Sequence, residues 1–135
     1  MKLIFCIDEK KGMMFFGKRQ SQDSVLREWI ISHAAGSKLW MSSYSAKQFK
    51  ELEGYIVDDD YVSKATVGDY CFIEDKGYTL ENVSEIILCH WNRRYQADKV
   101  FDVDLKANSF KKVDSLDIKG SSHEKITIET YKKVQ

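Results

Sequence analysis

The chain has 135 residues, of which 43% are hydrophobic and 31% charged, and its 21 acidic and 21 basic side chains give a formal net charge of zero. A general nucleic-acid-binding protein needs a basic excess to attract phosphates, so this balance argues against nucleic acid as a partner. The length fits a single domain, residues 1–135, that is large enough to form a core without a metal or a disulfide.

The three cysteines, Cys6, Cys71 and Cys89, lie within apolar segments. An odd number of cysteines in such positions is typical of reduced, buried thiols, which predicts a cytoplasmic protein. No spacing of Cys and His residues indicates a metal site. The first apolar segment ends at Asp8 and is too short for a signal sequence or a membrane span, so we expect no association with membranes.

Strand and helix patterns alternate through the first half of the chain. In residues 22–35, apolar side chains recur at helical spacing (Val25, Leu26, Trp29, Ile30 and His33), and Gly36 ends the pattern. Residues 8–20 have the composition of a loop. The other expected elements are strands at 2–7, 38–41, 55–57 and 69–74, a helix at 45–52 with Ser45 as its N-cap, and a brief helix or loop at 61–67.

The second half is dominated by strand patterns, at 84–91, 99–105, 108–118 and 124–134. The last of these alternates clearly, with Ile126 and Ile128 set against Lys125, Thr127 and Glu129. Strands that alternate with helices, followed by antiparallel additions, predict an α/β fold: a mixed, partly parallel sheet with flanking helices. Residues 2–7 should form a central strand of that sheet, flanked by the helix at 22–35.

This order of elements resembles the dihydrofolate reductase family. The matching segments at the start are LIFCI, Gly12–Met13, the loop 14–20, the helix-start acid Asp23, and KLWMSSYSAKQF. Later segments that look like the family are EIILCHWNRRYQADKVFDVDL, with Asp98 and Phe101 in corresponding places, and HEKITIETYKK. The resemblance implies a reduced dihydrofolate-reductase-like architecture.

The same resemblance shows where the chain departs from the family at the cofactor positions. The family has a Gly-Gly pair after a central strand, where the backbone approaches the phosphates of a nicotinamide cofactor, but here Glu74 and Asp75 follow the strand. Two carboxylates at that place would repel a pyrophosphate. The family's Gly-Arg-x-Thr turn is Ser42–Ser45 here: Ser45 can replace the threonine hydroxyl, but the arginine is missing. We therefore expect no nicotinamide cofactor.

Asp23 allows two interpretations. Its place at the border of the apolar stripe suits a carboxylate that points into a cleft and binds the N–H edge of a ligand, as the resemblance implies. An acid in the first helical turn is also favoured by the helix dipole, and Asp23 is spaced to pair with Arg27. The sequence leaves both open, with some preference for the second.

The other candidate ligand-binding residues are polar groups near the expected cleft or in the segment HWNRRY. Arg19 and Gln20 suit an anionic or amide-bearing ligand, and Arg93 and Arg94 suit a partner or a nucleotide. These four are also explained by a solvated loop or strand end. Ser45 is a candidate because its hydroxyl can replace that of the family's threonine, as the resemblance implies. The acids Glu74, Asp75 and Asp58–Asp60 have no spacing that favours a metal ion. Ser24, Ser42 and Ser43 have no identifiable His–acid partner, so the sequence assigns no catalytic residue.

The leading hypothesis is a small cytoplasmic domain that has lost the nicotinamide-cofactor motif and acts by binding a protein or a small polar ligand. The binding site would be the cleft between the loop 12–20, the helix 22–35 and the turn at Ser42–Ser45. The alternative is an NAD(P)H-dependent reductase of a pterin-like or nucleotide-like substrate with rearranged cofactor contacts. A third hypothesis is a nucleic-acid-directed protein that uses the arginine segment at Arg93 and Arg94. Whether the protein is an enzyme, and its oligomeric state, stay open at this stage.

Overall fold

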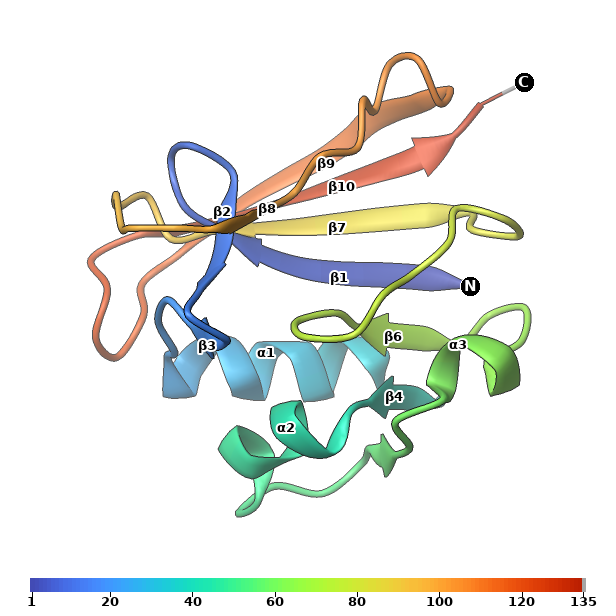
Figure 1. The fold of residues 1–135 in the computed structure, drawn as a ribbon, viewed down its shortest axis with the longest axis horizontal. Coiled ribbons are helices and arrows are strands. Elements are labelled where there is room, and N and C mark those ends of the chain that lie inside the picture. Colours follow the sequence, from blue (N-terminus) through green and yellow to red (C-terminus); the bar gives the residue numbers. More distant parts are fainter. Residues whose placement is uncertain (135) are drawn as a thin grey trace.

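The computed structural model describes residues 1–134 and contains a seven-stranded and a three-stranded sheet (Figure 1). The strands are β1 (Lys2–Ile7), β2 (Gly12–Phe15), β3 (Lys18–Arg19), β4 (Leu39–Met41), β5 (Ile56–Val57), β6 (Tyr70–Phe72), β7 (Glu85–His90), β8 (Lys99–Val100), β9 (Phe110–Ile118) and β10 (Ile126–Lys133). The helices are α1 (Ser24–Ala34), α2 (Ser43–Ala46), α3 (Tyr61–Lys64) and the 3₁₀ helix η1 (Lys47–Phe49).

The large sheet has the strand order β5-β4-β6-β1-β7-β10-β9. The first five strands of this order run parallel to one another, and β10 and β9 add antiparallel pairings at one edge. The predicted α/β class with a mixed sheet is therefore confirmed. Strand β1 lies in the middle of the order, as expected for residues 2–7.

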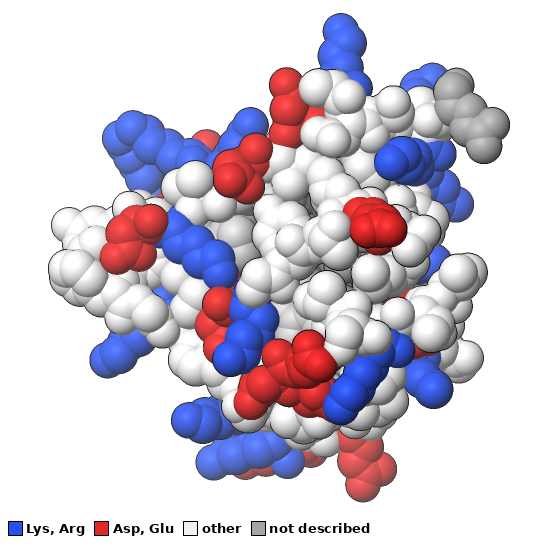
Figure 2. Space-filling view, turned by 45° about the vertical axis from the view of Figure 1, so that its right-hand side comes forward, with Lys and Arg blue, Asp and Glu red and all other residues white. Residues whose placement is uncertain are grey.

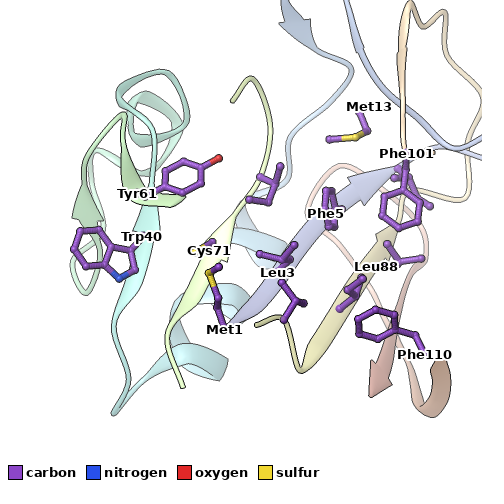
Figure 3. Close-up of a cluster of buried hydrophobic side chains, with 14 of the residues drawn as sticks. Met1, Leu3, Phe5, Met13, Trp40, Tyr61, Cys71, Leu88, Phe101 and Phe110 are labelled. Atoms are coloured by element: carbon purple, nitrogen blue, oxygen red, sulfur yellow. The ribbon is translucent and has the colours of Figure 1, made fainter. Parts of the chain in front are cut away.

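Side chains of β1 point alternately to the two faces of the sheet, which builds a core on each side. Leu3 and Phe5 belong to one buried cluster, in which Phe101 packs edge-on against Phe5, and Figure 3 shows these side chains side by side. Ile4 belongs to the other cluster, which also holds Leu26 and Ile30 of α1. Helix α1 therefore covers one face of the sheet. On the other face, Met13 and Met14 of β2 and Tyr61 of α3 pack into the cluster together with loop residues.

Helix α1 is shorter at each end than the predicted 22–35. Asp23 is its N-cap, and its buried side chains, Leu26, Ile30 and Ala34, lie four residues apart along one stripe. Beyond the C-cap, Gly36 adopts a φ of +89°, a conformation that glycine reaches without strain.

Three predicted segments differ from the structure. The expected loop 8–20 contains the hairpin β2–β3, which joins β8 in the three-stranded sheet. The strand expected at 99–105 is only the two residues of β8. The helix expected at 45–52 is α2 followed by η1, and its N-cap is Ser42, whose hydroxyl accepts a hydrogen bond from the Ser45 amide.

All three cysteines are free, and Cys71 and Cys89 are buried while Cys6 is half-buried. Cys6 and Cys89 are opposite each other on β1 and β7. A hydrogen bond to Cys89, together with burial, raises the pKa of the Cys6 thiol, and burial raises the pKa of Cys71 to about 12. Because the thiolate is the reactive species, these thiols should be inert in the folded protein.

We expect a thiol reagent such as dithionitrobenzoate to react with the native protein at pH 8 far more slowly than with the same protein in guanidinium chloride, where all three thiols should react. The kinetics of absorbance at both conditions measure this. Fast labelling of two or more cysteines in the native protein would contradict both the burial and the raised pKa values.

Candidate functional site

The Asp23 carboxylate is buried and accepts hydrogen bonds from two directions. Its Oδ1 accepts the Val25 and Leu26 amides at 2.9 and 3.2 Å, which caps α1. The segment between β9 and β10 donates the rest: the amides of Ser121 and Ser122, the Ser122 hydroxyl, and His123 Nδ1 at 3.0 Å. Asp23 therefore joins the start of α1 to a loop about a hundred residues away.

The loop fits closely around this carboxylate. A Cβ atom at Gly120 would lie 2.9 Å from Asp23 Cγ and 3.0 Å from the His123 carbonyl oxygen, so only glycine fits there. Burial acts to raise the pKa of Asp23, but the hydrogen bonds from Ser122 and His123 outweigh it and hold the pKa well below its usual range. Asp23 is thus ionised at neutral pH. Arg27 contacts Gln22 instead, at 3.1 Å, so the expected pairing of Asp23 with Arg27 is not formed.

His123 also contacts Ser21, Tyr95 and Trp91. The other ring nitrogen of His123, Nε2, lies 2.9 Å from the Ser21 hydroxyl and 3.3 Å from the Tyr95 hydroxyl. The indole of Trp91 stacks on the imidazole with ring centroids 4.6 Å apart. Because an ionised carboxylate can only accept, His123 Nδ1 carries a proton towards Asp23, and in the neutral ring Nε2 accepts from Ser21.

Arg19 and Glu74 form a second buried cluster. The guanidinium of Arg19, at the end of the hairpin, donates to both oxygens of Glu74, at 2.9 and 3.0 Å. The Ser45 hydroxyl and the Gln48 amide donate to Glu74 Oε1 at 2.8 and 3.2 Å. Arg19 also lies over the ring of Tyr44, 4.3 Å from its centroid. Glu74 therefore ties the hairpin β2–β3 to α2 and η1.

Two further carboxylates, those of Asp75 and Asp59, accept hydrogen bonds from the serines at the start of α2. Asp75 accepts from the Ser42 hydroxyl at 2.7 Å, and Asp59 accepts from the amide and the hydroxyl of Ser43 at 2.8 and 3.0 Å. The donors that begin this helix are thus already satisfied by acids of the same chain.

The remaining candidate residues have different environments. The Gln20 amide nitrogen donates to Asp8 and to the Gln96 carbonyl, while its buried Oε1 has no partner in the part of the chain that the structure describes. Arg93 donates to the Ser122 carbonyl at 3.2 Å. Arg94 is exposed.

The cleft between the hairpin, α1 and η1 is nearly filled. Two cavities of about 10 Å³ each lie in it, and both are lined by Cys6, Ser21, Glu74 and Trp91. Such a volume holds about one water molecule. A larger, open cavity of about 540 Å³ lies elsewhere, lined by β1, β7, Tyr131 and residues 101–105.

Asp23, Arg19 and Gln20 line the small cavities of the cleft. Ser45 is next to the cleft, where its hydroxyl donates to Glu74, which lines both cavities. Arg93 and Arg94 lie outside the cleft. Within residues 1–134, no group of three or more His, Cys, Asp or Glu side chains is arranged to hold a metal ion. In the same range, no helix has the length and apolar character to cross a membrane.

Sequence reasoning missed Ser21 and His123, as well as the pairing of Arg19 with Glu74. Ser21 and His123 are 102 residues apart, and Arg19 and Glu74 are 55 apart. The only local signal was the segment GSSH, whose glycine and serines precede His123 as in a tight polar loop.

Comparisons with known proteins agree with this fold. No family model matches the chain, and no curated protein matches it in sequence. A solved structure described as dihydrofolate reductase from Enterococcus faecalis, complexed with NADP(H) and RAB-propyl, matches with a TM-score of 0.69 and 12% identity, covering 99% of this chain and 96% of that chain. At this identity the likeness shows the fold: the chain has a dihydrofolate-reductase-like fold.

Proposed function

We propose that this chain is a binding protein on a dihydrofolate-reductase-like fold and that it does not use a nicotinamide dinucleotide. The observation that carries the proposal is the set of acids Glu74, Asp75 and Asp59. These acids accept the hydrogen bonds of the serine hydroxyls and of the amide at the start of α2, close to the end of β6. The resemblance places the cofactor phosphates at this position.

The physical reason differs from simple charge repulsion. Glu74 is paired with Arg19, so its charge is compensated within the protein. A phosphate at this place would have to displace carboxylates that already hold the Ser43 amide and the hydroxyls of Ser42, Ser43 and Ser45. Losing the contacts of Glu74 or Asp75 leaves a buried or half-buried carboxylate unpaired, which is costly, whereas Asp59 is exposed and loses a surface contact.

The proposed binding site is the cleft between the hairpin β2–β3, α1 and α2. Because its cavities hold about one water molecule each, a ligand enters only when the hairpin moves and the Arg19–Glu74 pair opens. The donors that are then freed, on Arg19, Ser45 and Gln48, suit a small polar ligand or a protein side chain that carries a carboxylate. Free thiols support a cytoplasmic location.

Nucleic acid is not part of the proposal. On the face displayed in Figure 2, basic and acidic side chains are interspersed, and no large patch of one sign is visible. A phosphate backbone binds to continuous positive surfaces.

We expect NADPH at millimolar concentration to leave the melting temperature unchanged. A ligand at a hundred times its dissociation constant adds about 2.7 kcal/mol to the stability of the native state, which is several degrees for a domain of this size. A thermal-shift titration measures this, with a dihydrofolate reductase as positive control.

A shift of several degrees that saturates with NADPH and is lost in Ser45→Ala would overturn the proposal. It would support the alternative, a reductase of a pterin-like or nucleotide-like substrate with rearranged cofactor contacts.

A further inference from the structure

Ser21, His123 and Asp23 form a chain of hydrogen bonds with the arrangement of a nucleophile, a base and an orienting acid. The Ser21 hydroxyl lies 2.9 Å from His123 Nε2, and His123 Nδ1 lies 3.0 Å from Asp23 Oδ2. The two contacts use opposite nitrogens of one imidazole, which is what base-activated acyl transfer requires.

The surroundings fix the imidazole in the productive form. Asp23 has its other contacts from backbone amides and from the Ser122 hydroxyl, and these hold its side chain in place. Trp91 stacks on the ring and restricts its rotation. With the Nδ1 proton directed to Asp23, Nε2 of the neutral ring can accept the proton of Ser21, whose hydroxyl is closer to it than the Tyr95 hydroxyl, at 2.9 against 3.3 Å.

Ser21 is accessible enough to react. It retains partial solvent exposure, whereas His123 and Asp23 are buried. The amide N–H of Gln22, the next residue, donates no hydrogen bond to another residue within 1–134. The amide after the nucleophile is a common donor to the oxyanion of acyl-transfer intermediates.

We propose that Ser21 is the nucleophile of an esterase-like site for carboxylic esters with a small acyl group, with His123 as its base and Asp23 as the positioning residue of His123. The two cavities beside Ser21, of about 10 Å³ each and partly lined by Leu26, Phe72 and Trp91, hold about one water molecule each. An ester therefore enters only when the hairpin β2–β3 moves, and this narrow cleft favours a small acyl group.

The reaction needs no reagent besides water. Ser21 Oγ forms a bond to the ester carbonyl carbon while its proton passes to His123 Nε2. The ester C–O bond then breaks, and Nε2 returns the proton to the leaving alcohol. Water attacks the acyl-serine with the same nitrogen as base, which releases the carboxylic acid and restores the Ser21 hydroxyl.

The test uses p-nitrophenyl acetate with the full chain. Release of nitrophenolate should be faster with the wild type than with Ser21→Ala by about 100-fold, the usual contribution of an activated nucleophile with its base. Peptide mapping by mass spectrometry of the quenched wild type should place an acetyl group on Ser21. Ser37→Ala, which changes an exposed serine beyond the C-terminal end of α1 and away from this cluster, is the matched control and should keep the wild-type rate.

Ser21→Ala loses one side-chain hydrogen bond, and its melting curve checks that it folds. Equal rates for wild type and Ser21→Ala, or acetyl groups on lysines alone, would overturn the proposal. If the variant does not fold, peptide mapping of the wild type still shows whether Ser21 carries the acetyl group. The result is independent of NADPH binding, so this proposal and the proposed function succeed or fail separately.

Discussion

Replacing Asp23 by alanine is expected to lower the free energy of unfolding by about 3–5 kcal/mol, the range observed when one partner of a buried ionic network is removed. The carboxylate caps α1 and also receives the loop amides of Ser121 and Ser122 and the ring of His123. Without it, these donors stay buried and unsatisfied, so the loss exceeds the roughly 1 kcal/mol of an ordinary N-cap. Urea denaturation of both proteins measures the difference.

Glu28→Ala is the matched control. Glu28 is exposed on the same helix, and its change should alter the free energy of unfolding by less than about 0.5 kcal/mol. A loss of no more than about 1 kcal/mol for Asp23→Ala would mean that the loop contacts add nothing to the helix cap.

The stability difference should also depend on pH. The pKa of Asp23 is lowered in the folded state from an ordinary value of 3.8, so the ionised carboxylate stabilises the folded protein. This contribution is complete above about pH 5 and is lost as the pH falls below the unfolded pKa towards the folded one. The gap between wild type and Asp23→Ala should therefore narrow below about pH 4. A gap that stays constant down to pH 2 would contradict the lowered pKa.

Much of the fold could be predicted because each buried strand is a short apolar run of its own. Strand β1 is the clearest case, since all but one of its residues are apolar and its neighbours in the sheet are also apolar runs. The sequence did not predict the hairpin β2–β3, because the two residues of its turn are unusual for a hairpin. Phe16 and Gly17 connect the two strands with φ values of +49° and +71°. Such a turn usually carries Asn-Gly, so a phenylalanine at its first position gave no hairpin signal.

The site could be predicted only where a residue acts on its own segment. Asp23 was placed correctly at the start of a helix, because capping involves the amides of the next few residues. Its partner His123 comes from a loop that β9 and β10 bring to the end of α1, and nothing near position 23 encodes this. The sequence also did not predict that Arg19 compensates the charge of Glu74, because Arg19 lies 55 residues away in a segment with the composition of a solvated loop. Whether Asp23, Gln20, Arg93 or Arg94 contacts a ligand stays a prediction.

Arg19→Met is expected to lower the free energy of unfolding by about 3 kcal/mol or more, because it leaves the Glu74 carboxylate buried without its cation. The two side chains are 17% and 8% exposed, so water cannot replace the lost contacts fully. Glu74→Gln leaves Arg19 without its anion in the same way. In the double variant both charges are gone, so its loss should be smaller than the sum of the single losses by about 2 kcal/mol.

Urea denaturation of the four proteins completes this double-mutant cycle. Lys18→Met, an exposed lysine one position before Arg19, is the matched control and should leave stability unchanged. A coupling energy near zero would mean that the pair is solvated in solution, since exposed pairs contribute little.

The same variants separate a local from a global role of the pair. Arg19 joins the hairpin β2–β3 to Glu74, so Arg19→Met should speed amide hydrogen exchange in Gly12–Arg19 more than in α1, whose core contacts through Leu26 and Ile30 are unchanged. That pattern would show that the hairpin opens separately from the rest of the fold, as access to the cleft requires. Equal acceleration in both elements would mean instead that the hairpin opens only when the whole protein unfolds, and that the cleft does not admit a ligand by this route.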